Sequence, residues 1–255
     1  MRWVLSRRSR QEVSRFFEGP ALLAFDLDGT LAPIVSDPRR VRIPARTRRL
    51  LAGLAETHPC AVISGRSCAD LRAMVNGTGI PHLVGNHGAE PSPHAAEIRR
   101  QVAQWKAALS ANLPGMPGLV VEDKRLSLTV HYRHCAHKQQ ALEAILDAAR
   151  PLAHARAVPG KESVSLVHRD APDKGDALRA LQRRLGCDRA LFVGDDSTDE
   201  DVFALGGYPG LLTVRAGWSG ASRAQYFLRG QYEIDALLAF CAHVSQPLHS
   251  ALTVL

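Results

Sequence analysis

The stretch ALLAFDLDGTL, residues 21–31, decides the fold that this sequence predicts. Its first five residues are apolar, which is typical of a strand buried on both faces of a parallel sheet. Asp26 follows directly, and Asp28 comes two residues later, before Gly29 and Thr30. Ligands of parallel sheets bind beyond the carboxyl ends of the strands, so the two carboxylates predict a ligand site there. The alternative is an ordinary capped turn, because Asp and Gly are common turn residues.

Other short apolar runs predict the rest of the sheet, with helical patterns between them. The runs are CAVIS (60–64), PHLVG (81–85), ALFVG (190–194) and GLLTV (210–214). Apolar residues at helical spacing predict one helix over 47–57 and another over 174–185, which Gly186 would end. Strands that alternate with helices indicate an α/β fold, with a Rossmann-like parallel sheet covered on both faces.

The middle of the chain has a different pattern. Residues 119–133 alternate apolar and polar side chains around a polar turn at 122–125, which predicts antiparallel strands. A helical pattern follows over 138–149, and then a strand-like SVSLV at 163–167. This part of the chain therefore predicts a small α+β unit rather than a continuation of the parallel sheet.

A chain of 255 residues is long enough for a core domain with a smaller insert. Pro-rich EPSPH at 90–94 and RDAPDKG at 169–175 bound the unusual middle. We therefore predict an α+β cap over residues 91–168, inserted into a core of residues 1–90 and 169–255.

Composition argues against several locations and partners. No apolar run approaches the length of a membrane span, so we expect no membrane partner. The N-terminus is basic and lacks a following apolar stretch, which predicts a short amphipathic helix around 13–17 rather than a signal peptide. The five scattered cysteines form no CxxC pair, so we expect reduced thiols and a cytoplasmic protein. Oligomeric state stays open.

The net charge of +7 raises the question of nucleic-acid binding. The densest basic run is RRVRIPARTRR, residues 39–49. No aromatic residues interleave with it and no nucleic-acid motif accompanies it, so we favour a solvated helix face and expect no nucleic-acid partner. The positive field would still attract a small anionic substrate.

A second acidic cluster strengthens the ligand-site interpretation. GDDSTDED, residues 194–201, places five acids directly after the predicted strand ALFVG. One or two acids would cap the following helix, but five exceed that need. So many carboxylates beside Asp26 and Asp28 are costly unless a cation lies among them. Hard oxygen ligands suit Mg²⁺, which often bridges to phosphate.

Two further residues fit a phosphate ligand. Ser64 ends the predicted strand CAVIS and is followed by Gly65, so its hydroxyl and nearby backbone N–H groups would bind phosphate oxygens. Lys174 comes just before the helix over 174–185 and supplies a point charge. Each signal is weak alone, since Ser64 also suits a helix cap and Lys174 a surface position.

Together, these residues resemble the four motifs of the haloacid-dehalogenase-like phosphatases, in order. Within that superfamily the chain resembles the trehalose-6-phosphate phosphatase family. The stretches that carry the narrower resemblance are DLDGTLAPI (26–34), VISGR (62–66), GNHGAE (85–90), EDKRLSLTVHYR (122–133), PDKG (172–175) and GDDSTDEDVF (194–203).

The resemblance implies a Mg²⁺-dependent phosphatase that hydrolyses trehalose 6-phosphate through an aspartyl-phosphate. Asp26 would be the nucleophile and Asp28 the general acid and base, with Ser64 and Lys174 neutralising the phosphoryl oxygens. The metal ligands would be Asp26, the Asp28 backbone carbonyl and Asp195. The acids expected to support those ligands are Asp196 and Asp199.

The resemblance also implies that the cap closes over the core and contacts the sugar. The substrate-binding residues it implies are Arg66, Asn86, His87, Gly88, Glu122, Lys124 and Arg133. One departure stands out, since the family usually has a glutamate where this chain has Ser165. Glu162 lies three residues earlier and would need a shift of register to serve.

Three alternatives follow from these observations. The same chemistry on another sugar or polyol phosphate fits the Ser165 departure. A non-catalytic sugar-phosphate sensor would use the fold for binding alone, although it would not need Asp28. The histidines at 131, 134 and 137 with Cys135 suggest zinc, but their spacing matches no tight structural site.

Overall fold

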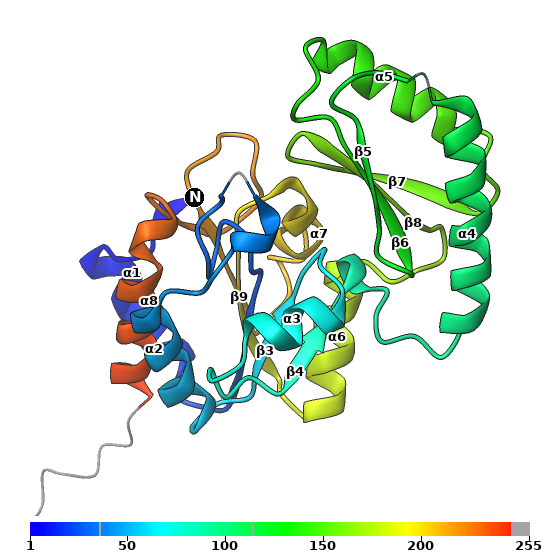
Figure 1. The fold of residues 1–255 in the computed structure, drawn as a ribbon. Helices are drawn as coiled ribbons and strands as arrows, with labels where there is room; N and C mark the ends of the chain where they lie inside the picture. The colour runs from blue at the N-terminus through cyan, green and yellow to red at the C-terminus, as the bar shows by residue number, and fades with distance from the viewer. Residues whose placement is uncertain (36, 114, 246–255) are drawn as a thin grey trace, which may run out of the picture.

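The computed structural model describes residues 1–35, 37–113 and 115–245, and these form two separate sheets (Figure 1). The larger sheet has seven strands, all parallel, in the order β1-β11-β10-β9-β2-β3-β4. Its strands are β1 (Arg2–Trp3), β2 (Ala21–Phe25), β3 (Cys60–Ile63), β4 (His82–Val84), β9 (Arg189–Gly194), β10 (Leu211–Ala216) and β11 (Tyr226–Leu228). The predicted parallel α/β core is confirmed.

The run ALLAF forms β2, near the middle of this sheet. All five of its residues are buried, which is why they are continuously apolar. Leu23 lies opposite Cys60 of β3 on one side and Leu191 of β9 on the other. The carboxyl ends of β2, β3 and β9 therefore meet at one edge of the sheet.

Helices cover both faces of the larger sheet. The helices are α1 (Arg7–Phe16), α2 (Ala45–Ala55), α3 (Cys68–Met74), α6 (Lys174–Leu185), α7 (Glu200–Phe203) and α8 (Ile234–Val244), with short 3-10 turns at η1 (Pro38–Arg40), η2 (Asn86–Gly88), η3 (Ser197–Asp199) and η4 (Gln231–Glu233). Leu23 of β2 packs in a core with Leu51 of α2, while Leu22 packs with Leu178 of α6 on the opposite face. The alternation along β2 thus sends successive side chains into two hydrophobic cores.

The smaller sheet is antiparallel, in the order β5-β6-β8-β7. Its strands are β5 (Val120–Asp123), β6 (Ser127–His131), β7 (Ala155–Gly160) and β8 (Ser163–His168). Helices α4 (Ala95–Asn112) and α5 (Lys138–Ala149) pack on one face of this sheet, on the side away from the core (Figure 1). The predicted small α+β unit is confirmed, whereas the domain limits at 90/91 and 168/169 stay a prediction.

The hairpin of the cap corrects one detail of the sequence interpretation. Glu122 and Asp123 belong to β5 rather than to the turn, and Glu122 pairs with Thr129 of β6. Because side chains alternate along a strand, Leu128 and Val130 enter the cap core while Thr129 and His131 face the larger sheet's domain. Glu122 is therefore aimed at a defined face and not at solvent in a loop.

Several expectations concern the surface. Within the part of the chain that the structure describes, no helix combines the length and apolarity needed to span a membrane. All five cysteines are free and buried. The basic run 39–49 starts in η1 and ends inside α2, where Thr47 is buried and the arginines on either side of it are at least partly exposed.

Candidate active site

Three strand ends bring together two predicted catalytic residues and one predicted metal ligand. Asp26 follows β2, Ser64 follows β3 and Asp195 follows β9, and β2 lies between the other two strands. Asp26 is only 4 % exposed, and Ser64 is buried beside it. The sheet topology alone therefore places a hydroxyl and a second carboxylate on either side of the Asp26 carboxylate.

Gly29 makes the turn after Asp26 fit against Asp195. Its φ of +84° lies in the region that favours glycine, and its N–H donates to the Ala32 carbonyl at 2.7 Å. A Cβ on Gly29 would lie 2.2 Å from Oδ2 of Asp195. Thr30 then donates its hydroxyl to the other Asp195 oxygen at 3.2 Å. The DGT sequence thus fixes the position of the Asp195 carboxylate.

Lys174 is the buried cation of the site. It is the first residue of α6, which Asp173 caps through a capping box, and it is 1 % exposed. Its Nζ donates to Oδ1 of Asp26 at 3.0 Å and to Oδ1 of Asp199 at 2.7 Å. Burial disfavours the charged amine, but the two carboxylates outweigh it and raise the pKa of Lys174 above its usual range. Lys174 is therefore a fixed positive charge.

Asp199 is a supporting residue rather than an open ligand. Its Oδ2 accepts the backbone N–H groups of Asp195 and Asp196 at 2.8 and 2.9 Å, while its Oδ1 accepts Lys174. The carboxylate is fully buried. Asp196 instead lines the cavity described below and caps η3 through Ser197. Asp199 thus shapes the loop that carries Asp195.

The buried acids form a site that suits a divalent cation. Oxygens of Asp26, Asp195 and Asp199 all lie within 4.8 Å of one another. Burial and the neighbouring carboxylates raise the pKa of Asp195 to about 7, and burial also raises the pKa of Asp26 well above its usual range. A hard cation bound among these carboxylates would offset their mutual repulsion and the cost of burying their charges. Asp28 does not belong to this cluster of side chains.

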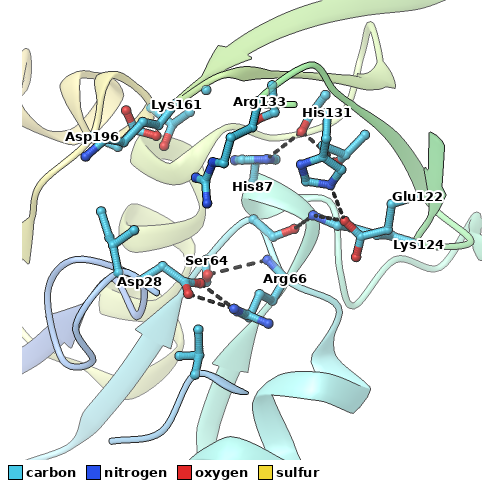
Figure 2. Close-up of a pocket in the computed structure, with 18 of the residues that line it drawn as sticks. Asp28, Ser64, Arg66, His87, Glu122, Lys124, His131, Arg133, Lys161 and Asp196 are labelled. Carbon is cyan, nitrogen blue, oxygen red and sulfur yellow. Dashed lines mark hydrogen bonds and ion pairs between the residues drawn. The ribbon is translucent and has the colours of Figure 1, made fainter. Parts of the chain in front are cut away.

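The Asp28 carboxylate instead faces Arg66. Arg66 donates from Nε to Oδ2 at 2.6 Å and from its terminal nitrogen to Oδ1 at 2.7 Å (Figure 2). Such a bidentate pair fixes both the position and the rotation of the carboxylate. Arg66, which the sequence assigns to substrate, therefore orients Asp28 in this structure.

A cavity of about 490 Å³ lies between the core and the cap, above these residues. The core contributes Asp26, Asp28, Ser64, Gly65, Arg66, His87, Lys174, Asp195 and Asp196 to its walls. The cap contributes Glu122, Lys124, Thr129, His131, Arg133, Lys161 and Ser165. The catalytic candidates thus line one wall of the cavity and polar cap residues line the other (Figure 2).

The predicted cap contacts Glu122, Lys124 and Arg133 line this cavity. Lys124 is mostly buried and donates its Nζ to the Gly65 carbonyl at 3.1 Å, which ties the cap hairpin to the core beside Ser64. His131 lies 2.8 Å from Glu122, and this hydrogen bond lowers the pKa of Glu122. Burial lowers the pKa of Lys124.

Of the three residues in GNHGAE that the sequence assigns to substrate, one lines the cavity and two have structural contacts. His87 lines the cavity, its ring occupies the space that a side chain at Gly65 would need, and Nε2 lies 3.3 Å from the Ser165 hydroxyl. Asn86 is fully buried and bonds to Glu90 and Ser127, outside the cavity lining.

Gly88 is outside the lining as well. A Cβ there would lie 2.5 Å from the Asp173 carbonyl, so Gly88 lets η2 pack against the loop before Lys174. The structure therefore gives Gly88 a packing role, which the spacing in the sequence does not reveal.

The position that departs from the family pattern faces the cavity. Ser165 lies opposite Thr129 across β6 and β8, with 2.9 Å between the two hydroxyl oxygens. Glu162 lies in the β7–β8 turn, where it pairs with Arg133 at 3.2 Å and with Lys138, and it does not line the cavity. This wall is therefore formed by hydroxyls.

Sequence reasoning missed Thr129 and Lys161 as cavity residues. The alternation along β6 contains a signal for Thr129, because it lies two residues before His131 on the same face. Lys161 lies in the turn between β7 and β8, where no periodic pattern predicts the direction of its side chain.

Comparisons with known proteins agree with this geometry. The family profile for trehalose-phosphatase matches residues 24–207. A trehalose-phosphate phosphatase of Mycobacterium avium is 37 % identical over 195 residues, which cover 70 % of this chain and 49 % of that protein. An uncharacterized glycosyl hydrolase of Mycobacterium tuberculosis is 32 % identical over 241 residues, or 87 % of this chain and 18 % of its own length. The chain thus spans between about a fifth and a half of these relatives.

Solved structures share the fold. The C-terminal domain of Candida albicans trehalose-6-phosphate phosphatase superposes with a TM-score of 0.78 at 22 % identity, covering 92 % of this chain and 96 % of that one. The sucrose-phosphatase of Synechocystis, solved with sucrose and phosphate, superposes with a TM-score of 0.57 at 19 % identity, covering 88 % of this chain and 97 % of that one. On the strength of the profile match over most of its length, this chain belongs to the trehalose-phosphatase family.

Proposed function

We propose that this chain is a phosphatase that hydrolyses trehalose 6-phosphate to trehalose and phosphate, as part of trehalose biosynthesis. The observation that carries the proposal is the buried arrangement around Asp26. A carboxylate held by a buried lysine, beside a second carboxylate and a serine hydroxyl, opens into a cavity large enough for a sugar phosphate. This arrangement suits phosphoryl transfer, in which positioning and charge neutralisation supply most of the catalysis.

In this proposal Asp26 is the nucleophile. Lys174 holds its Oδ1, so Oδ2 is the oxygen that we assign to attack phosphorus. The bond from phosphorus to the sugar oxygen breaks as an aspartyl-phosphate forms. An ammonium group has three donors, and Asp26 and Asp199 take two, which leaves one for a phosphoryl oxygen. Ser64 supplies a further donor from the end of β3.

Asp28 is the group that we assign to proton transfer. It gives a proton to the departing sugar oxygen and then takes a proton from the water that attacks phosphorus, which releases phosphate and restores Asp26. Arg66 holds the Asp28 carboxylate at both oxygens, so proton transfer requires one of these hydrogen bonds to yield when substrate enters.

A divalent metal fits the same site, and we propose Mg²⁺. Asp26 and Asp195 would hold it, together with the backbone carbonyl of Asp28, while Asp196 and Asp199 support the loop. The fit rests on the all-oxygen donor set and on the closeness of these carboxylates, and burial together with neighbouring carboxylates raises the pKa values of Asp26 and Asp195. When bound, the ion would neutralise charge on the phosphoryl group.

The cap residues are assigned to the sugar. We propose that Glu122, Lys124 and Arg133 bind sugar hydroxyls, with His87 and Arg66 beside them on the core wall. Figure 2 shows Arg133 reaching from the cap into the space above Asp28 and Ser64. A polar wall of this kind suits a ligand with many hydroxyls.

Phosphate release from a substrate panel tests the proposal. Trehalose 6-phosphate, glucose 6-phosphate, sucrose 6-phosphate and an aryl phosphate would each be assayed with Mg²⁺ and with a chelator. We expect Mg²⁺-dependent release with a clear preference for trehalose 6-phosphate. A preference for another sugar phosphate would keep the chemistry and replace the substrate. No release by a folded protein from any member of the panel would contradict the proposal and favour a sugar-phosphate sensor.

A further inference from the structure

A second group of metal-ligating side chains lies in the cap and takes no part in the proposed chemistry. It consists of His154, His168 and Asp170. His154 directly precedes β7, His168 ends β8, and Asp170 lies in the linker that returns from the cap to Lys174. The three residues are outside the lining of the active-site cavity.

The backbone fixes the relative positions of these residues. Ala155 pairs with His168 across β7 and β8, which places His154 diagonally beside His168 at the open end of the hairpin. The Arg169 N–H donates to the His154 carbonyl at 2.7 Å, and the Asp170 N–H donates to Nδ1 of His168 at 3.3 Å. The first bond joins the two strand ends through main-chain atoms alone, and the second holds the Asp170 backbone against the His168 ring.

The side chains are close enough for one ion to bridge them. One nitrogen from each imidazole and one Asp170 oxygen all lie within 4.8 Å of one another, and Nδ1 of His168 lies 3.9 Å from Oδ2 of Asp170. Bonds of about 2.0–2.2 Å in tetrahedral geometry require ligand atoms roughly 3.4 Å apart. A modest contraction of the group would therefore complete a three-ligand site. Ligation through Nδ1 of His168 would replace the 3.3 Å hydrogen bond that this nitrogen accepts from the Asp170 N–H.

The orientation of the two imidazole rings determines which side chain must rotate before a metal ion can bind. Their centroids are 5.6 Å apart and their planes differ by 4°, so the two lone pairs do not converge on one point. His154 and Asp170 are exposed, so rotation of either side chain meets little packing resistance. Turning the His154 ring toward Asp170 is the movement that binding needs.

We propose that these three residues form a transition-metal site that links the start of β7, the end of β8 and the return linker. Two imidazoles and one carboxylate suit Zn²⁺ and its first-row neighbours, whereas Mg²⁺ prefers oxygen ligands alone. Three protein ligands leave a fourth position for water. The site is distinct from the carboxylate site at Asp26 in both place and ligand chemistry, and its role is structural.

Equilibrium dialysis of the full chain against Zn²⁺ tests the proposal, with excess Mg²⁺ present to occupy the carboxylate site. We expect one bound Zn²⁺ whose affinity falls more than about tenfold in each of His154→Ala and His168→Ala. The matched control is His137→Ala, which removes a cap histidine from the segment that also contains His134 and Cys135.

The visible absorption of bound Co²⁺ gives a second readout, because tetrahedral Co²⁺ absorbs far more strongly than the hydrated ion. The band should appear in wild type and His137→Ala and be lost in His168→Ala. The proposal is overturned if wild type binds no Zn²⁺, if His154→Ala and His168→Ala bind it as wild type does, or if only His137→Ala loses it.

Discussion

At the scale of single residues, Gly29 carries a constraint that its sequence context only suggests. The turn needs a positive φ, and the missing side chain leaves room for the Asp195 carboxylate. Asp195 cannot simply move aside, because Thr30 holds its other oxygen and Asp199 holds its backbone N–H. The residue thus connects the first acidic motif to the second.

Gly29→Ala should therefore lose activity well beyond its effect on stability. The positive φ costs about 1–2 kcal/mol of folding free energy, and displacement of Asp195 by the new Cβ should lower kcat by about a hundredfold. Gly77→Ala is the matched control, since Gly77 has a φ of +79° and no atom within 4 Å of the added Cβ. Urea unfolding and steady-state kinetics of both variants check this. Equal activity of the two variants would contradict the role given to Gly29.

At the scale of elements, the β5–β6 hairpin joins the cap to the catalytic core through Lys124. The side chain is 12 % exposed and reaches the Gly65 carbonyl, next to Ser64. Lys106 contacts the same hairpin at Asp123, but its side chain is 51 % exposed. One lysine therefore forms a buried interdomain contact, and the other forms a surface ion pair.

Lys124→Met should lower kcat/KM by about tenfold or more, because a buried charge-assisted hydrogen bond contributes roughly 1.5–3 kcal/mol. Lys106→Met should leave kcat/KM unchanged, since exposed ion pairs contribute about 0–1 kcal/mol to stability and this one lies outside the cavity. Steady-state kinetics on the preferred sugar phosphate measure both. Similar kinetics for the two variants would show that hairpin docking through Lys124 does not serve the site.

The elements that sequence predicts well are those whose pattern has one physical cause. Phe25 and Leu23 lie in a continuous apolar run because β2 is buried on both faces. The sequence predicts that Gly186 ends a helix, and it does so with a φ of +63°. The sequence does not predict strand β7, because Pro159 and Gly160 in ARAVPG are typical of turns and its side chains are only partly buried.

Some site residues can likewise be placed from the sequence, and others cannot. Asp26, Ser64 and Asp195 could be placed from sequence, because strand ends in a parallel sheet share one edge. Asn86 could not, since η2 has φ values of +51° at Asn86 and +59° at His87 that no periodic pattern describes. In such a turn, the direction of each side chain depends on tertiary contacts rather than on spacing.

At the scale of the whole molecule, the buried acids tie stability to pH. The pKa of Asp195 is about 7 in the folded protein, compared with 3.8 for an unperturbed aspartate such as that of the unfolded chain. Between about pH 4 and pH 7 the folded protein therefore keeps a proton that the unfolded chain has lost, and the stability contributed by this group falls as pH rises. A cation at the site would offset the loss.

Asp195→Asn removes this dependence. In chelator, the free energy of unfolding of the variant relative to wild type should rise as pH increases from 5 to 8, and Mg²⁺ should reduce the difference by stabilising only the wild type. Urea unfolding at several pH values measures it. Parallel curves for the two proteins would mean that Asp195 titrates in the folded protein as it does in the unfolded chain.

The most direct test of the central claim is to trap the covalent intermediate. Trehalose 6-phosphate labelled in its phosphoryl group would be mixed with the enzyme and Mg²⁺, quenched in acid within one turnover, and the labelled peptide mapped. The account predicts label on the peptide that carries Asp26, with neither label nor turnover in a folded Asp26→Asn variant. Turnover by Asp26→Asn at a rate near that of the wild type would contradict it.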